Sequence, residues 1–325
     1  MLNKYFKKNG STYLTFILAL IIIFIIYYLQ KVTPLGKNSL LTIDFYHQYG
    51  PMLGELFDRI KTNSTLIYSF SMGMGLPFIR NFLNYLSSPF NLIIFLFNRD
   101  NLLLSYSIVI AIKVALAATS MSYFLNKKFN VQNIIFVPIS LLYAFCAYFT
   151  AYYWNIMWLD GMVFLPIIIL GIEKLVDKNK YLLYIFSLAL MLFANYFIGY
   201  MICIFSFVYF LGYLLISKLS NIKQFINKIL LFIASSLLSA GLVAVLLIPL
   251  FLSLKSISAT SDLWPSSQYY FFSFWEFLAN HFTGVGSTVF SSGISNAANI
   301  SVGILSIPLI MLFIINPKIN YKIKL

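Results

Sequence analysis

The sequence predicts an all-α polytopic membrane protein with about eight transmembrane helices, built as a single transmembrane domain over residues 1–325. Of its 325 residues, 61% are hydrophobic and 10% are charged, whereas soluble domains are roughly a quarter charged. The mean hydropathy is +0.87. Apolar runs recur along the chain, and most approach the roughly 20 residues that a helix needs to cross a bilayer. No Pro-rich or Gly/Ser-rich linker divides these runs, which indicates one domain.

The first predicted span covers residues 12–29 and follows a lysine-containing segment, residues 1–10. It resembles a signal peptide, but it is longer than a usual signal-peptide apolar region and no small-residue cleavage site follows. We therefore expect an uncleaved helix with a cytoplasmic N-terminus. The other predicted spans are 101–125, 133–151, 162–175, 181–194, 197–216, 229–252 and 302–315.

The charge distribution supports this topology. The predicted inner segments carry fourteen lysines against two acidic residues, whereas the outer segments carry seven basic and seven acidic residues. An excess of Lys and Arg in short loops marks the cytoplasmic side. The formal charge of +13 is thus explained by topology, and no nucleic-acid partner is expected.

Two outer loops are long enough to form a site, at about residues 30–99 and 253–301. In the first, Pro51 favours a helix start, and residues 52–61 form an amphipathic pattern typical of a surface helix. Residues 88–97 are apolar but too short to span, which indicates a re-entrant or interfacial segment.

Several reaction classes have no visible site. The chain contains no P-loop, GxGxxG, HExxH or GxSxG motif. Cys146 and Cys203 lie inside apolar spans without metal-ligand spacing, so we interpret them as small buried hydrophobic residues.

Asp44 is the strongest catalytic candidate, because it is the first carboxylate after the first span. His47, Gln48 and Tyr49 follow it and offer hydrogen bonds to a substrate. Such a carboxylate can deprotonate an acceptor hydroxyl or hold a divalent cation, so Asp44 is the expected ligand if a metal takes part. The structural alternative is a helix cap or a solvated loop charge.

A tight outer turn at residues 152–161 holds the next candidates, Asn155, Trp158 and Asp160. Its aromatic residues are also typical of a membrane-interface belt. A carboxylate so close to an apolar helix is costly unless it has a partner, faces water or caps the helix.

Five further residues have both a functional and a structural interpretation. Lys113 lies within a span, where it can act in function, snorkel or pair with another helix. Arg80 can hold a phosphate oxygen or form a loop ion pair. Asn195 and Tyr196 can face the outer side or join helices. His281, in the second long loop, is a possible acid, base or ligand.

Several motifs together resemble one family. They occur in order across about residues 10–250: Asp44-Phe-Tyr-His-Gln-Tyr-Gly-Pro51, Gly73-x-Gly75, Ser88-Pro-Phe-Asn-Leu92, Trp158-Leu-Asp-Gly-x-x-Phe-Leu-Pro166 with Gly171-Ile-Glu173, and Asn195-Tyr-Phe-Ile-Gly-Tyr-Met201. This series resembles the YfhO family of bacterial membrane proteins. Members of that family are usually longer, so the chain is expected to be an N-terminal part or a shortened member.

The resemblance implies a GT-C type glycosyltransferase in the bacterial cytoplasmic membrane. Such an enzyme takes a sugar from a polyprenyl-phosphate carrier on the outer face and adds it to a cell-envelope polymer such as teichoic acid. Asp44 matches the essential acidic residue of the first outer loop. The resemblance also implies a separate carrier-sugar synthase and a flippase as partners.

Two other function classes compete with this interpretation. A lipid or small-molecule transporter or flippase would place ionisable groups near the bilayer midplane, often within inverted repeats. Lys113 fits that pattern, but no repeat is evident. A noncatalytic membrane scaffold would require that Asp44 and Asp160 are structural. A shared outward cavity for Asp44 and Asp160 would favour the enzyme.

Overall fold

The computed structural model describes residues 2–217, 219, 221–254, 273–282 and 300–324, and among these residues the named elements are all helical. The long helices are α1 (Leu2–Leu29), α4 (Leu102–Lys128), α7 (Leu159–Lys178), α9 (Tyr196–Ile216) and α10 (Ile222–Leu242). The shorter ones are α2 (Gly50–Lys61), α3 (Phe78–Asn81), α5 (Phe136–Ala144), α6 (Ala147–Tyr152), α8 (Leu182–Ala194), α11 (Ala244–Leu254), α12 (Phe274–Ala279), α13 (Ser306–Ile315) and α14 (Tyr321–Lys324).

Four of the described helices are long and apolar enough to cross a membrane: Asn9–Leu29, Arg99–Lys128, Tyr196–Ile216 and Ile222–Leu242. These segments identify a membrane protein. α7 also has 20 residues, but Asp160 and Glu173 interrupt its apolar sequence. α8 and α13, with 13 and 10 residues, are short for a full crossing. The remaining crossings of the eight-span topology stay predictions.

Two predicted spans are not continuous helices. Residues 133–151 divide into α5 and α6, because the backbone is extended at Cys146. Residues 229–252 divide at Val243, and α10 starts seven residues earlier than predicted, at Ile222. Both breaks lie within uninterrupted apolar sequence, where hydropathy alone carries no signal for a helix end.

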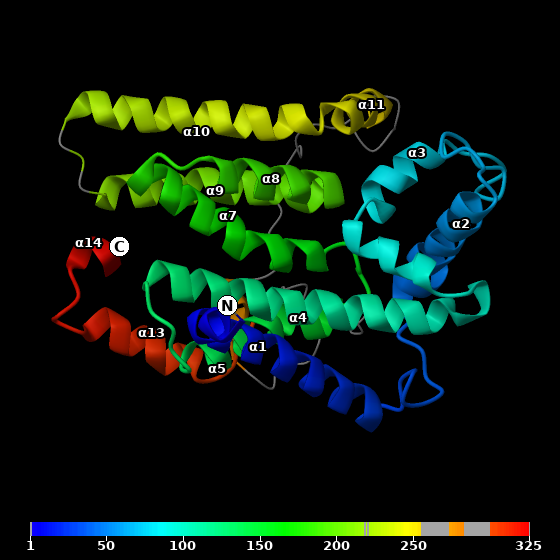
Figure 1. Ribbon diagram of the computed structural model, residues 1–325, viewed down its shortest axis with the longest axis horizontal. Coiled ribbons are helices and arrows are strands. Elements are labelled where there is room, and N and C mark those ends of the chain that lie inside the picture. The colour runs from blue at the N-terminus through cyan, green and yellow to red at the C-terminus, as the bar shows by residue number, and fades with distance from the viewer. Residues whose placement is uncertain (1, 218, 220, 255–272, 283–299, 325) are drawn as a thin grey trace.

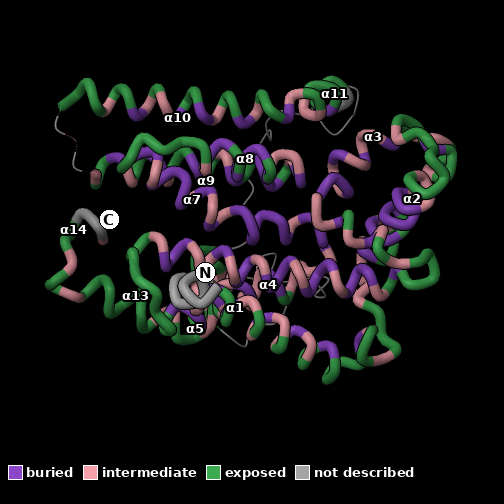
Figure 2. Tube along the Cα trace, viewed as in Figure 1, coloured by how far each residue is buried: buried purple, intermediate pink, exposed green. Residues whose placement is uncertain are grey.

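α4 lies at the centre of the bundle and packs against α1, α5 and α7, while α7 also contacts α8 and α9. Of the apolar stretch of α4, 67% is buried, against 28% for α1 and α9 and 22% for α10. Figure 2 shows the same contrast between the buried α4 and the exposed α10. α1, α9 and α10 therefore supply the apolar outer surface of the bundle.

The packing of α7 on α8 depends on a glycine. A Cβ added to Gly171 would lie 2.6 Å from the backbone nitrogen of Tyr184 and 2.7 Å from its Cα atom. Because these are backbone atoms, no rotamer change could relieve the clash. Gly171 thus sets the close approach of the two helices.

Residues 44–97, here called the outer cap, gather at one end of the bundle, where α2 and α3 appear in Figure 1. α2 confirms the predicted amphipathic helix with Pro51 in its first turn, and buries Met52, Leu53, Leu56 and Phe57. Ile60, near the end of α2, is 48% exposed.

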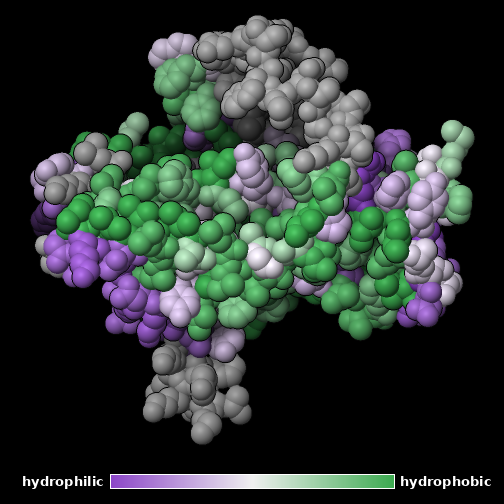
Figure 3. All heavy atoms as spheres, turned by 90° about the horizontal axis from the view of Figure 1, so that it is seen from above, coloured by the Kyte–Doolittle hydropathy of each residue, from purple (hydrophilic) through white to green (hydrophobic). Residues whose placement is uncertain are grey.

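Polar surface gathers at the two ends of the bundle. In Figure 3, the visible face carries hydrophobic side chains across its middle and hydrophilic ones toward both ends. This is the distribution expected of a bundle whose middle lies in lipid. The charge pattern predicts that the outer cap lies on the noncytoplasmic side.

The segment predicted to be re-entrant or interfacial, residues 88–97, forms a 3-10 helix over Pro89–Leu96 that packs on α4. Of the second long loop, residues 255–272 and 283–299 lie outside the described residues, so its predicted extent is described only in part. Its described part includes α12, which starts with a Ser273–Glu276 capping box.

Candidate functional site in the outer cap

Asp44 lies directly before a widened helical turn, Phe45–Tyr49, which leads without a break into α2. Its side chain makes no capping hydrogen bond, so the cap interpretation fails. Instead, the Tyr49 hydroxyl donates to Asp44 Oδ2 over 3.4 Å. Burial and the neighbouring Asp44 carboxylate raise the pKa of Tyr49 above its usual value, so this phenol stays protonated as a donor.

Beside this turn lies a cavity of about 390 Å³. Three of the predicted site residues, His47, Gln48 and Arg80, line it together. Their side chains come from segments more than 30 positions apart in the sequence, which the Gly73-x-Gly75 turn brings back toward α2. Gly73 and Gly75 have φ values of +52° and +115°, which a residue with a Cβ rarely adopts. Asp44 itself is not among the lining residues.

Sequence reasoning missed three polar residues in the same cavity wall, Glu55, Ser71 and Asn81. Glu55 belongs to α2. Its Oε1 accepts hydrogen bonds from Arg59 Nε at 2.7 Å and Ser69 Oγ at 2.8 Å. Burial alone would raise the pKa of Glu55, but these hydrogen bonds and the Arg59 charge outweigh it and hold the pKa below its usual value. Glu55 is therefore an anion that orders the cavity wall.

His47 also lines a second cavity, of about 950 Å³, on the side where α2 meets the start of α4. Arg99 and Asp100 are its charged lining residues. Arg99 Nε pairs with Asp58 Oδ1 at 2.8 Å in an exposed ion pair. His47 and Pro51 line both cavities, and the His47 ring lies 5.0 Å from the Tyr46 ring.

A series of aromatic side chains connects Asp44 to the start of α9. The Tyr49 and Tyr85 rings lie 5.1 Å apart. The Tyr196 hydroxyl in turn interacts electrostatically with Tyr85 and Arg80. The start of α9, with Tyr196, thus lies against the segment Phe82–Leu86 that carries Tyr85, although Tyr196 lines neither cavity.

Asn195 acts as a joint between the outer cap and α9. Its Oδ1 accepts from the backbone nitrogen of Ile198 at 2.8 Å, which caps α9, and its Nδ2 donates to the Asn84 carbonyl at 2.7 Å. Next to it, Ser87 Oγ donates to the Ala194 carbonyl at 3.3 Å. Asn195 therefore joins α9 to the outer cap, as the helix-joining interpretation expects.

Asp160 lies in a different environment. Lys113 Nζ donates to Asp160 Oδ2 at 2.9 Å, and neither side chain has any exposed surface. Ser88 Oγ donates to Asp160 Oδ1 at 3.0 Å. Since Asp160 is fully buried, it does not share the expected outward cavity with Asp44 within the part of the chain that the structure describes. Of the three interpretations of Lys113, the structure agrees with pairing to another helix, because its partner Asp160 lies in α7.

The remaining predicted residues lie outside the two cap cavities. Asn155 is 1% exposed, and within the described part of the chain its Nδ2 has no hydrogen-bond partner. Trp158 packs between hydrophobic clusters on both sides of the turn, 6.0 Å from the Tyr152 ring. His281 Nδ1 lies 3.0 Å from the Phe277 carbonyl of its own turn.

The described residues do not fit a metal site built from protein ligands alone. Divalent cations in proteins are held by several oxygen or nitrogen ligands. Over the described part of the chain, His, Cys, Asp and Glu side chains do not gather in groups of three or more. Asp44 accepts a hydrogen bond from Tyr49, and the mechanism proposed below uses no metal ion.

Comparisons with known proteins give one family. The family model described as "Bacterial membrane protein YfhO" matches residues 15–325. No curated protein matches the chain, and no solved structure does. The match covers nearly the whole sequence and extends past the motifs that carry the resemblance. The chain therefore belongs to the YfhO family of bacterial membrane proteins.

Proposed function

We propose that this chain is a GT-C type membrane glycosyltransferase that moves a sugar from a polyprenyl-phosphate carrier to a cell-envelope polymer such as teichoic acid. The observation that carries the proposal is the outer-cap cavity, where Arg80 and His47 meet beside the Asp44–Tyr49 turn. This cavity has charged and polar side chains in its wall and lies at the end of an apolar bundle. A lipid-linked sugar needs that combination, because its tail stays in the bilayer while its phosphate and sugar reach the interface.

The chemistry assigns a separate task to each group. Asp44 accepts the proton of the acceptor hydroxyl as its oxygen forms a bond to the anomeric carbon. The bond between that carbon and the phosphate oxygen breaks, and the polyprenyl phosphate leaves as an anion. Arg80 holds this phosphate through charge-assisted hydrogen bonds. Tyr49 keeps the Asp44 carboxylate oriented.

The proposal includes the eight-span topology with a cytoplasmic N-terminus, which puts the outer cap outside the bacterial cytoplasmic membrane. The inner lysine excess supports that orientation. The carrier-sugar synthase and the flippase would then act earlier, on the cytoplasmic side and across the bilayer.

The transporter alternative is favoured by one observation, the charged pair of Lys113 and Asp160 within the helices. Ionisable groups in membrane helices often mark a transport path. This pair is fully buried, however, and lines none of the described cavities. The buried pair therefore fits a fixed structural contact better than a transport path. The experiment below tests the scaffold alternative.

The test replaces Asp44 with Asn and measures the sugar content of the envelope polymer in cells, at matched protein abundance. Because general acid–base groups contribute about 10²–10⁴-fold, we expect a loss of at least about a hundredfold. Asp58→Asn is the matched control, since it removes an exposed carboxylate of the same cap. Unchanged glycosylation in Asp44→Asn would remove Asp44 from the mechanism and favour the scaffold.

A second measurement tests the side of the membrane. A cysteine at position 44 should react with a membrane-impermeant thiol reagent added to intact cells, after the two native cysteines are replaced. Reaction only after the cells are opened would refute the outer location of the site.

A further inference from the structure

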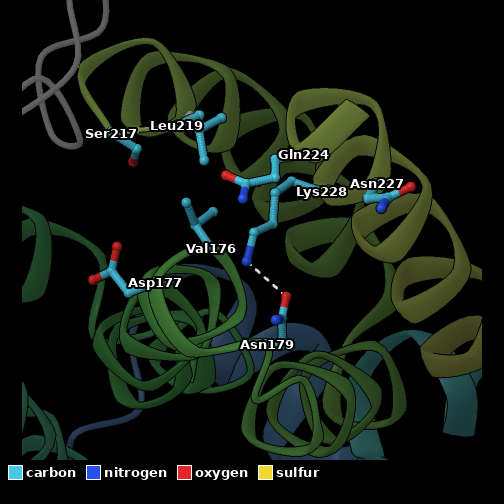
Figure 4. A pocket seen from close by; sticks show the side chains of 8 residues that line it. All are labelled: Val176, Asp177, Asn179, Ser217, Leu219, Gln224, Asn227 and Lys228. Atoms are coloured by element: carbon cyan, nitrogen blue, oxygen red, sulfur yellow. Dashed lines mark hydrogen bonds between the residues drawn. The ribbon is translucent and has the colours of Figure 1, made fainter. Parts of the chain in front are cut away.

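A polar cavity of about 560 Å³ lies between the end of α7, the start of α10 and the residues Ser217 and Leu219 (Figure 4). Its lining residues are Val176, Asp177, Asn179, Ser217, Leu219, Gln224, Asn227 and Lys228. Figure 1 places the start of α10 at the opposite end of the bundle from the outer cap. The charge pattern predicts that this end is cytoplasmic. The cavity is thus separate from the site proposed for glycosyl transfer.

The cationic wall of this cavity is Lys228. Its Nζ donates to Asn179 Oδ1 at 2.6 Å and to the Leu175 carbonyl at 3.4 Å. The residue is 9% exposed, and Figure 4 shows its side chain extending from α10 toward the end of α7. An ammonium group has three N–H donors, so these two contacts leave one for a ligand.

The anionic wall is Asp177, on α7. The Tyr213 hydroxyl donates to Asp177 Oδ2 at 2.8 Å. Asp177 and Lys228 lie near enough to interact electrostatically, yet within the described residues they form no ion pair within 4.0 Å. In Figure 4 the two side chains occupy different walls, with the cavity between them. Opposite charges are therefore held apart across a polar space.

The neighbouring charges do not neutralise this arrangement. Glu173, one turn before Asp177, is bound by Lys128 and by the Tyr209 hydroxyl at 2.6 Å. Lys174 lies near other lysines, Lys127, Lys178 and Lys180, and does not line the cavity. Asp177 and Lys228 are then the two charges that face the cavity from its lining residues.

The surface beside the cavity suits lipid chains. From the lining residue Asn227, the same face of α10 continues at intervals of three and four residues through Leu230, Ala234 and Leu238. Leu230 and Leu238 are 59% and 52% exposed. An amphiphile could thus keep its apolar chains on α10 while its polar group enters the cavity.

We propose that this cavity binds the headgroup of a zwitterionic phospholipid with a primary amine, with the phosphate on Lys228 and the ammonium on Asp177. The opposite charges of the two walls match the opposite charges of such a headgroup. The amide side chains of Gln224 and Asn227 supply further hydrogen bonds to the phosphate oxygens. This inference is independent of the proposed glycosyl transfer.

The experiment uses the purified full-length chain in detergent and measures thermal unfolding and lipid binding. Three probes are added in separate arms: phosphatidylethanolamine, phosphatidylglycerol and water-soluble phosphoethanolamine. We expect binding and a raised Tm with phosphatidylethanolamine, and at least fivefold weaker effects with the other two. Equal or tighter binding of phosphatidylglycerol would overturn the proposal in favour of an anionic lipid site. Equal binding of phosphoethanolamine would overturn it in favour of a soluble ligand.

The variants test both walls. Lys228→Gln and Asp177→Asn should each weaken phosphatidylethanolamine binding about tenfold or more, because each removes a charge-assisted contact. Lys223→Gln is the matched control, since Lys223 is exposed on the same helix and does not line the cavity. Asn227→Leu provides an independent variant if the loss of the Lys228–Asn179 contact prevents folding. Unchanged binding in Asp177→Asn and Asn227→Leu would refute the site.

Discussion

Lys113 and Asp160 form a fully buried ion pair, 2.9 Å from Nζ to Oδ2, that joins α4 to the first turn of α7. Lys113 Nζ also donates to the Ile156 carbonyl at 2.8 Å. Ser88 brings the outer cap into the same network through Asp160. One contact thus connects the central helix, the turn before α7 and the cap.

Breaking this pair on one side should destabilise the protein strongly. Lys113→Met leaves Asp160 buried without its cation, and such losses cost about 3–5 kcal/mol. The double variant Lys113→Met, Asp160→Leu should recover much of that cost, because no buried charge remains. Thermal unfolding in detergent measures both. The exposed pair of Arg99 and Asp58 is the control, and Arg99→Gln should change stability by about 1 kcal/mol or less. Equal effects of Lys113→Met and Arg99→Gln would contradict this role.

Gly171→Leu should separate α7 from α8. Any side chain at this position meets the backbone of Tyr184, and overpacking of this kind costs about 1–3 kcal/mol. Gly212→Leu is the matched control, because nothing lies within 4 Å of a Cβ added there. Loss of Tm in Gly171→Leu alone is the expected outcome, and a similar Tm for the two variants would show that the close approach is not needed.

Asn195→Ala should loosen both α9 and the outer cap. It removes a helix cap worth about 0.5–2 kcal/mol and leaves the Asn84 carbonyl without its donor. Hydrogen exchange should therefore quicken at residues 82–86 as well as at the start of α9. Asn221→Ala removes the comparable cap of α10 without any contact to the outer cap. Faster exchange of residues 82–86 in the Asn221 variant too would argue against a specific joint.

The outer cap should lose order in acid through Glu55. The pKa of Glu55 is lower in the folded protein than its ordinary value of 4.5, so its stabilisation is complete above that ordinary value. As the pH falls through the folded-state pKa, the stabilisation is lost. Limited proteolysis within residues 62–77 at pH 6 to 3 should detect this change. Glu55→Gln should be cleaved readily across the whole range, whereas Asp58→Asn should keep the wild-type profile.

Arg80 should matter to the proposed reaction in a way that Arg99 does not. Arg80→Gln removes the expected phosphate contact, so transfer activity should fall about tenfold or more. Arg99→Gln removes a cation from the neighbouring cavity and serves as the control. In vitro transfer from a polyprenyl-phosphate sugar measures both variants. Equal losses in the two would indicate a general charge effect on the cap.

The sequence predicted the features that depend on local pattern. The amphipathic face of α2 and its start at Pro51 follow directly from residue spacing. The excess of lysines in the predicted inner segments is found by counting residues alone. The helix breaks at Cys146 and Val243 could not be predicted, since both lie within apolar sequence where hydropathy carries no signal for a helix end.

The candidate site divides in the same manner. Asp44, His47 and Gln48 are neighbours in sequence, so their proximity was predictable. The approach of Arg80 and Tyr196 to that turn depends on how the cap folds back onto α9. The partner of Asp160 lies 47 positions away in another helix, and Glu55 was missed because an acidic residue on a surface helix is ordinarily solvated.

The tethers of residues 84–88 restrict how substrate can enter. Asn84, Ser87 and Ser88 are hydrogen-bonded to Asn195, Ala194 and Asp160 at the helix ends. This side of the cap is therefore held against the bundle. Segment 62–77 is held to α2 by the Ser69–Glu55 and Arg59–Thr65 hydrogen bonds, and within the described residues it makes no hydrogen bond to α7, α8 or α9. If the cap binds the proposed lipid-linked sugar, access to the cavity would therefore depend on movement of segment 62–77 rather than of residues 84–88.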